Sequence, residues 1–273
     1  MSESGFSTSF LAAPVVPPTP PVSRAVRRLD YTHFTVWLDP ERRLALSTGV
    51  NIDGSALLDL GRGDDWHLDA RIPESEQTGP AVYARNDLDR GHLVRRRDPV
   101  WGERAIAQAA NVDSFCYTNA APQASGFNQS KELWLGVETL VFDFADVHDA
   151  KLSVFTGPVL AADDPIYRGV GIPRHFWKIA VWSPDGASLA SSAYVLDQSA
   201  LIEPFERDEG VLPDLGAFRT FQVAVAEVGA LTGLDVAALA DVDRFAPGVT
   251  ARGESPWREL AGPEDVLRGI RGD

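Results

Sequence analysis

Cysteine is nearly absent from the 273-residue chain, in which Cys116 is the only one. A single thiol excludes an internal disulfide framework and a zinc site built from several cysteines, and it fits a reducing compartment. No apolar run approaches the ~18 residues of a membrane-spanning helix. No basic segment precedes the short apolar stretch near the N-terminus. These absences predict a cytoplasmic protein without a secretory signal or a membrane span.

Lysine is also scarce, with three residues against 22 arginines, and acidic residues outnumber basic ones by 39 to 25. The net charge of −14 argues against a protein that coats nucleic acid through bulk electrostatics. Half of this charge lies in residues 201–273, whereas the stretch 81–100 has five arginines against three aspartates. Because the planar guanidinium group suits phosphate, this stretch is a candidate for anion binding.

Alternating apolar and polar residues predict a hairpin of two strands at 32–38 and 44–52. A helical period runs from 129 to about 148. The stretch 54–111 is rich in Gly, Asp, Arg and Pro and is predicted to be mostly loop, which at this length is usually functional. Further strands are expected at 152–160, 178–183, 192–196 and 220–225, and a short helix at 226–233.

We expect one α+β domain, because neither an internal repeat nor a clean linker divides the chain. Five prolines in residues 14–22 predict an extended, mobile arm that serves as a linker or docks a partner. The chain is therefore divided into a flexible proline-rich arm (1–24), a folded domain (25–250) and a polar tail (251–273).

The most informative short stretch is Asp89–Arg90–Gly91–His92. A histidine near a carboxylate can act as a general base near neutral pH, and an adjacent arginine can neutralise a phosphate. The glycine permits a tight turn that would expose the histidine. Taken alone, the same four residues also fit a hydrogen-bonded histidine in a loop.

Three further motifs follow in order: TNAAPQ at 118–123, FNQ at 127–129 and WLGVE at 134–138. Together with DRGH at 89–92, they make the chain resemble the DNA/RNA non-specific endonucleases, the ββα-metal nucleases of the Serratia-nuclease and endonuclease G type. Flanking stretches extend the resemblance over about residues 30–245. It implies an α+β fold in which a strand–strand–helix finger holds a metal on a central, mainly antiparallel sheet flanked by helices.

The resemblance implies that Asn128 is the only direct protein ligand of a Mg²⁺ ion, with waters completing its shell. Mn²⁺ would suit the same oxygen-rich site. Glu138 is expected to hold metal-bound water in the outer shell. Asn128 and Trp134 are six residues apart, where well-known members have four, so Glu132 is the alternative carboxylate. Without the resemblance, Asn128 would be a helix N-cap and Glu138 a solvent-facing side chain.

The resemblance also assigns roles to residues of the first two motifs. His92 corresponds to the general base that activates water, and Arg90 to a residue that contacts the phosphate or shapes the loop around it. Asn119 corresponds to a residue that supports the site, and we count it with His92, Arg90 and Glu138 in the expected catalytic set. Asp89 and Gln123 are expected to support the site or to be structural.

The arginines depart from the family pattern in two ways. The family usually has alanine where Arg97 stands, and the family's upstream catalytic arginine corresponds to Asp64. A run of arginines can bind a nucleic-acid backbone, although a solvated charge run is the alternative. The residues expected to contact nucleic acid are Arg85, Arg95, Arg96 and Arg97, with Arg62 and Arg71 as candidates to replace the missing arginine.

These observations predict a Mg²⁺-dependent endonuclease that cleaves DNA, RNA or both with little sequence preference. The alternatives are a catalytically impaired nuclease fold that binds nucleic acid, suggested by Asp64, and an interaction protein docked through the arm. The acidic charge slows encounter with nucleic acid, which suggests a toxin or antiphage effector controlled by an activating or inhibitory protein partner. A homodimer is compatible with the sequence.

Overall fold

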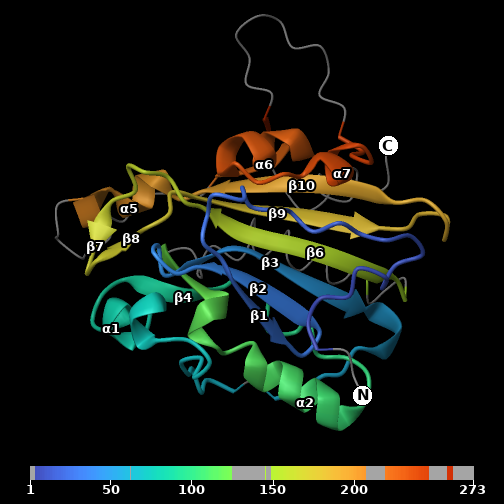
Figure 1. Ribbon diagram of the computed structural model, residues 1–273, viewed down its shortest axis with the longest axis horizontal. Coiled ribbons are helices and arrows are strands. Elements are labelled where there is room, and N and C mark those ends of the chain that lie inside the picture. The colour runs from blue at the N-terminus through green and yellow to red at the C-terminus, as the bar shows by residue number, and fades with distance from the viewer. Residues whose placement is uncertain are drawn as a thin grey trace, which may run out of the picture.

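The structure is a computed structural model that describes residues 4–61, 63–124, 145, 149–206, 219–245 and 257–260, with side chains only to 202 in the fourth range. Its main element is an eight-stranded antiparallel sheet whose strand order follows the chain (Figure 1). From one edge to the other the strands are β1 (Arg27–Tyr31), β2 (Phe34–Asp39), β3 (Leu44–Asp53), β6 (Lys151–Val159), β9 (His175–Trp182), β10 (Ala190–Asp197), β11 (Arg219–Val223) and β12 (Arg258–Glu259).

Short helices and two small strand pairs surround this sheet (Figure 1). Within the described ranges, none of the helices is long and apolar enough to cross a membrane. The strand pairs are β4 (Leu88–His92) with β5 (Ala120–Ala124), and β7 (Ile166–Tyr167) with β8 (Val170–Gly171). The helices are α1 (Pro80–Tyr83), α2 (Arg104–Asp113), α5 (Ser199–Glu206), α6 (Val225–Thr232) and α7 (Ala237–Ala240), and 3₁₀ turns lie at Gly54–Ala56, Glu74–Glu76 and Tyr117–Asn119.

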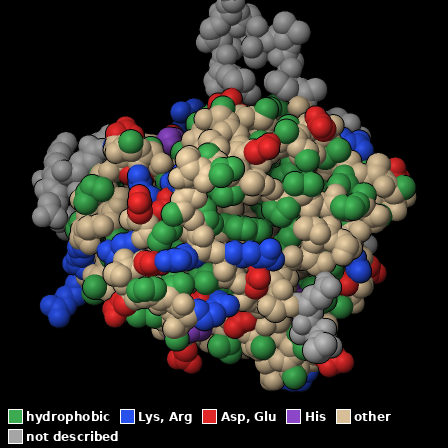
Figure 2. Space-filling view, in the orientation of Figure 1, with side chains coloured by type: hydrophobic (Ala, Val, Ile, Leu, Met, Phe, Trp, Pro, Cys, Tyr) green, Lys and Arg blue, Asp and Glu red, His purple; other side chains and the backbone are tan. Residues whose placement is uncertain are grey.

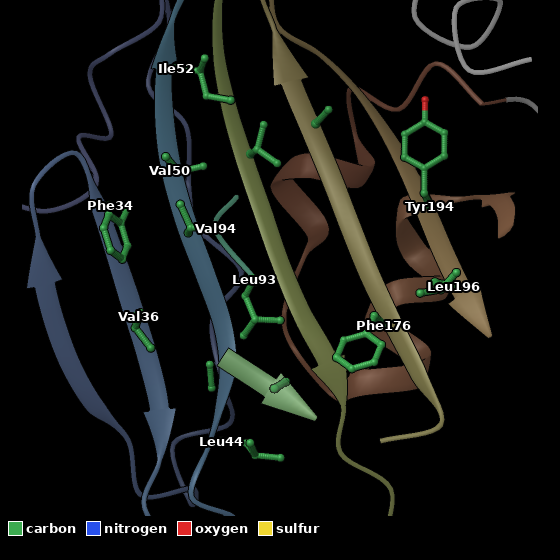
Figure 3. Close-up of a cluster of buried hydrophobic side chains, with 14 of the residues drawn as sticks. Phe34, Val36, Leu44, Val50, Ile52, Leu93, Val94, Phe176, Tyr194 and Leu196 are labelled. Carbon is green, nitrogen blue, oxygen red and sulfur yellow. The ribbon is translucent and has the colours of Figure 1, made fainter. Parts of the chain in front are cut away.

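The sheet is covered on both faces, which explains why its central strands are apolar on both sides. In β9, Phe176 and Ala180 belong to one buried cluster and Trp177 and Ile179 to the other. The first cluster includes side chains from β4–β5 and the residues that follow β4 (Figure 3). The second includes α6, α7 and the N-terminal arm. The β4–β5 pair, which carries DRGH and most of TNAAPQ, is therefore attached to the first face of the sheet.

The expected hairpin is confirmed by β2 and β3, and the later expected strands correspond to β6, β9, β10 and β11. The short helix expected at 226–233 corresponds to α6, which ends at Gly233 with a φ of 72°. The stretch 54–111 is mostly loop, as predicted, but it also contains α1, β4 and most of α2, which the composition did not indicate. The buried face of α2 consists of alanines, Ala107 and Ala110, which give a weak helical signal. Apart from Ala145, the helix expected at 129–148 lies outside the described residues.

The N-terminal arm was expected to be mobile, but residues 4–19 pack on the second face of the sheet. Phe6, Leu11 and Val15 are buried there. Thr19 and Asp235 exchange backbone hydrogen bonds of 3.0 and 2.8 Å. Prolines prevent the arm from forming a regular strand. Burial of the apolar residues between them still stabilises the folded state. Part of the expected polar tail is likewise ordered, as strand β12.

His33, at the turn into β2, gives the fold a pH-sensitive contact. Its ring stacks on Trp101 at 3.5 Å, and Nδ1 lies 2.8 Å from the carbonyl oxygen of Pro99. Burial lowers the pKa of His33, and it outweighs the opposite effects of the Pro99 hydrogen bond and of Asp53. The folded state therefore binds this proton less readily than the unfolded chain, whose histidine titrates near ~6.5.

We expect the free energy of unfolding to fall as the pH drops below ~6.5, because protonation of His33 then favours the unfolded chain. The variant His33→Asn tolerates the left-handed backbone at this position, where φ is 68°. It should show a smaller loss of stability between neutral and mildly acidic pH than the wild type, measured by urea unfolding. An unchanged loss would place the acid sensitivity elsewhere.

Candidate active site

The first two sequence motifs lie side by side on β4 and β5. His92 pairs with Ala120, Gly91 with Ala121 and Asp89 with Gln123, in an unbroken antiparallel register. Because side chains alternate along a strand, Arg90 and His92 lie on one face, and Asp89 lies on the other. DRGH was placed in a loop by its composition, and the structure shows it as a strand. The alternation also separates Asp89 from His92, so Asp89 is not the carboxylate that orients this ring.

Gly91 is required by close packing and not by a tight turn. A Cβ at this position would lie 2.0 Å from Cδ and 2.1 Å from Oε1 of Gln123, whose side chain crosses the backbone there. Gln123 is buried, which leaves its side chain little room to move. The expectation that the glycine makes a turn was therefore wrong, and the supporting role of Gln123 is to fill the space above Gly91.

His92 is half-buried and is framed by aromatic rings. The ring centroid of Trp66 lies 4.6 Å from that of His92, and Phe115 packs edge-on at 5.1 Å. Trp66 also contacts Phe115 and Tyr117, so the rings form one cluster. Rigid aromatic packing limits the rotamers open to the imidazole and holds it at the end of β4.

Asn119 fixes the backbone that follows His92. Its backbone carbonyl accepts a 2.9 Å hydrogen bond from Leu93 N, and its Oδ1 accepts one of 2.9 Å from Val94 N. Its Nδ2 donates to the carbonyl oxygens of Val94 and Ser114, at 2.9 and 3.0 Å. The side chain is fully buried and all its described partners are backbone groups. Asn119 is therefore placed as a positioning residue, and not in the catalytic set with His92.

Leu93 and Val94 strengthen this attachment. Both are buried in the first core cluster, beside side chains such as Val50 of β3 (Figure 3). The chain after His92 is thus held by hydrogen bonds to Asn119 and by apolar contacts to the sheet. A side chain on such a rigid support keeps its geometry, so no further ordering is needed when a ligand binds.

Arg90 lies over the same aromatic cluster. Its Cζ is 5.3 Å from the Trp66 ring centroid, and its Nη2 is 3.8 Å from Oδ1 of Asp64. Tyr83 stacks on Tyr117 at 6.0 Å, and its buried hydroxyl has no hydrogen-bond partner among the described residues. Burial raises the pKa of Tyr83 and the Tyr117 phenol adds to this, whereas the nearby Arg90 lowers it. Arg90 is thus bordered by an indole, a phenol and a carboxylate.

Sequence reasoning missed most of these neighbours of His92 and Arg90. Phe115, Tyr117 and Tyr83 carry no motif and were not identified. Trp66 begins WHLDARIP (66–73), one of the flanking stretches that extend the resemblance, but it was given no role. The signal that could have found them is the density of aromatic residues around the two motifs. Their contacts depend on how α1, β4 and the segment before β5 fold together.

Arg71, a candidate to replace the missing arginine, is held by the protein. Its guanidinium donates to both carboxylate oxygens of Asp69, at 2.6–3.1 Å, and to the carbonyl oxygen of Asp30 at 2.8 Å. It also lies 4.5 Å from the Tyr31 ring centroid. Burial opposes ionisation of Asp69, but hydrogen bonds from Arg71 and Tyr31 outweigh it and lower the Asp69 pKa. These contacts give Arg71 a structural role. The other candidate, Arg62, lies outside the described residues.

The remaining arginines differ in their exposure and in their contacts. Arg96 donates to the carbonyl oxygen of Leu60 and to Asn111 of α2, at 3.0 and 3.1 Å, and so ties the loop to that helix. Arg95 and Arg97 are half-buried on either side of it. Arg85 is exposed at a φ of 55°, where Arg168 donates to the preceding carbonyl oxygen of Ala84. Arg85 is therefore the best placed of these to reach a ligand.

The expected metal-site residues lie outside the described residues: Asn128, Glu138 and the alternative Glu132. Among the described residues, no group of three or more His, Cys, Asp or Glu side chains could hold a metal ion. The chemistry of the donor set still fits Mg²⁺, because an amide and a carboxylate supply the oxygen ligands that this ion prefers and waters complete its shell.

Comparisons with known proteins find relatives among nucleases. A family model described as DNA/RNA non-specific endonuclease matches residues 12–243. Among curated proteins, "Uncharacterized protein y4fB" of Sinorhizobium fredii is 43% identical over 217 residues, which are 76% of this chain and 33% of that protein. Mitochondrial endonuclease G of Bos taurus is 24% identical, over 66% of this chain and 62% of that protein. A nuclease of Syncephalastrum racemosum is 28% identical, over 66% and 60%.

A solved structure shows the same fold. The crystal structure of the EndoG/EndoGI complex, which concerns the mechanism of EndoG inhibition, matches with a TM-score of 0.56 at 20% identity. The match covers 76% of this chain and 84% of that one. The α+β fold class predicted from the sequence is thereby confirmed. The chain spans between one third and about three fifths of the length of these curated relatives.

Proposed function

The chain belongs to the DNA/RNA non-specific endonuclease family, and on this premise we propose that it hydrolyses phosphodiester bonds of DNA, RNA or both with a divalent metal ion. The observation that carries the proposal is the β4–β5 pair, which holds DRGH beside TNAAPQ with His92 half-exposed in an aromatic frame. The bound ion would be Mg²⁺ or Mn²⁺, held by Asn128 with Glu138 in the outer shell.

His92 acts as the general base in this proposal. Its neutral imidazole accepts a proton from the water that attacks phosphorus, and the cluster of Trp66 and Phe115 holds the ring in place for that transfer. Asn119 keeps the end of β4 fixed through Leu93 and Val94. When bound, the metal supplies positive charge that stabilises the charge developing on the phosphoryl oxygens.

Arg90 binds and orients the phosphate, because it lies on the same strand face as His92, two residues away. Side chains at such positions are neighbours on one face of a strand. The guanidinium lies over the indole ring of Trp66, which helps to hold it in place. Exposed Arg85, and the half-buried Arg95 and Arg97 that follow His92 in the chain, extend contact along the nucleic-acid backbone.

Regulation by a protein partner is part of the proposal. The chain carries a net charge of −14, which slows its encounter with nucleic acid, and a structural neighbour of the same fold was solved with its inhibitor. A toxin or antiphage effector that a partner activates or restrains fits both observations. A homodimer and a cytoplasmic location remain predictions of the sequence.

The proposal is tested by incubating supercoiled plasmid with the purified protein and Mg²⁺, with EDTA as the control. We expect nicked and then linear product with the metal and none with EDTA. A labelled RNA in a parallel reaction reports on the second substrate class. Absence of product from DNA and RNA with Mg²⁺ and with Mn²⁺, from protein shown to be folded by circular dichroism, would contradict hydrolysis by the isolated chain.

The second candidate function is a nuclease fold that binds nucleic acid with impaired catalysis. The contact between Asp64 and Arg90 favours it, because a carboxylate stands where the family has a catalytic arginine. This alternative predicts salt-sensitive binding of nucleic acid without metal-dependent product. Introducing the family residue, by Asp64→Arg, should then raise cleavage.

A further inference from the structure

Asp64 lies directly beside Arg90. Its Oδ1 is 3.8 Å from Nη2 of Arg90, and its carbonyl oxygen accepts a 3.0 Å hydrogen bond from the backbone N of Trp66. The turn that joins Asp64 to Trp66 therefore brings two groups to the same guanidinium, a carboxylate and the indole on which Arg90 stacks. The indole is held close to His92, because Trp66 packs on the His92 ring.

The contact between Asp64 and Arg90 is loose and open to solvent. The Asp64 side chain is 70% exposed and the Arg90 side chain 37%. Exposed ion pairs of this kind add little to folding stability, because water screens both charges. A phosphate carries stronger acceptor oxygens and can form shorter charge-assisted hydrogen bonds with arginine. The carboxylate can therefore be displaced from Arg90 without loss of the fold.

Carboxylates accompany many arginines of this chain. Figure 2 shows basic side chains in a band across one face of the molecule, with acidic side chains among them. Ion pairs of this kind include Arg24–Asp39, Arg27–Glu76, Arg28–Asp30, Arg42–Asp164 and Arg71–Asp69. What distinguishes the Asp64–Arg90 pair is its place, because Arg90 shares a strand face with His92.

We propose that Asp64 occupies the position on Arg90 that a phosphate of the nucleic acid takes, and that it acts as a competing anion within the site. The inference rests on the proposed function, in which a phosphate binds beside His92. Asp64 weakens substrate binding in two ways: it must leave Arg90 before the phosphate arrives, and its charge then repels that phosphate. Asp64 is thus a residue that sets the affinity of the site for polyanions.

The test compares Asp64→Asn with the matched control Asp65→Asn. Both substitutions remove one negative charge from the same exposed turn, but only Asp64 contacts Arg90 in the described structure. Binding of a short fluorescent single-stranded DNA is measured by anisotropy in EDTA, at low and at high salt. We expect Asp64→Asn to bind about 3–10-fold more tightly than Asp65→Asn at low salt, with a smaller difference at high salt.

A double-mutant cycle assigns the effect to the pair. In an Arg90→Ala background, Asp64→Asn should give no more tightening than Asp65→Asn, because the shared guanidinium is gone. Asp64→Glu, which keeps the charge, should bind as weakly as the wild type. Equal tightening by Asp64→Asn and Asp65→Asn would reduce the effect to net charge and overturn the proposal, as would no binding by any variant.

The outcomes separate this inference from the proposed hydrolysis. Suppose that the wild type cleaves with metal and that Asp64→Asn and Asp65→Asn bind equally. The nuclease proposal would then stand, and the role of Asp64 would be excluded. Selective tightening by Asp64→Asn, with no cleavage by any variant, would support the competing anion and contradict the hydrolytic activity.

Discussion

Replacing His92 with alanine should lower the rate of metal-dependent phosphodiester cleavage by about 10²–10⁴-fold, the usual contribution of a general base. The imidazole is the proton acceptor in the proposed reaction, and the described residues place no second histidine on its strand face. Phosphate contacts through Arg90 remain, so binding of nucleic acid should change far less than turnover. The measurement is plasmid nicking under single-turnover conditions, with binding followed by anisotropy in EDTA.

His67→Ala is the matched control for this substitution. His67 lies in the same segment as Trp66, but its side chain is exposed and its Nδ1 is 3.1 Å from the carbonyl oxygen of Asp65. It should retain wild-type activity. Near-ultraviolet circular dichroism of both variants checks that the aromatic cluster is preserved. Wild-type cleavage by a folded His92→Ala protein would exclude the imidazole as the base.

Replacing Asn119 with alanine should have the largest effect on stability. It leaves Val94 N, Val94 O and Ser114 O without the hydrogen bonds that the side chain provides in the interior. Each buried polar group without a partner costs about 1–3 kcal/mol, so we expect a loss of roughly 3–5 kcal/mol in the free energy of unfolding. Thermal unfolding should show a midpoint lowered by about 10 °C.

Activity at a temperature well below that midpoint distinguishes positioning from stability alone. Loosening Leu93 and Val94 moves the end of β4, so kcat should fall by about 10–100-fold while KM stays close to the wild-type value. Gln108→Ala, on the exposed side of α2, is the control and should leave stability within ~0.5 kcal/mol. An Asn119→Ala protein with wild-type kcat at low temperature would limit Asn119 to a structural role.

The sequence predicted the β2–β3 hairpin of the sheet well because the two strands carry a period of two in the sequence. The β2–β3 hairpin has alternating residues and a short turn, and both signals are local. Strand β4 was missed because its residues are mostly polar and include a glycine, which is a poor strand former. Its pairing with β5 is a contact between distant segments, and local propensity does not report on such contacts.

The site, like the sheet, was predicted where the signal is local in the sequence and missed where it depends on the fold. The motifs identified His92 and Arg90, because their residue types and order suffice for recognition. The hydrogen bonds of Asn119 to Val94 were not predictable, because they depend on which backbone groups lie near the Asn119 amide in the folded chain. The arm was misjudged for a similar reason, because proline content predicts an extended chain but not whether that chain lies on an apolar surface.

The pairing of Thr19 with Asp235 has a consequence for how the protein is made. The strands of the main sheet follow the order of the chain, so each can join its neighbour as it leaves the ribosome. The end of the arm at Thr19 cannot, because its partner Asp235 is synthesised more than two hundred residues later. The beginning of the arm can bind Tyr31, Thr35 and Asn51 early, whereas its end at Thr19 is fixed only when translation is nearly finished.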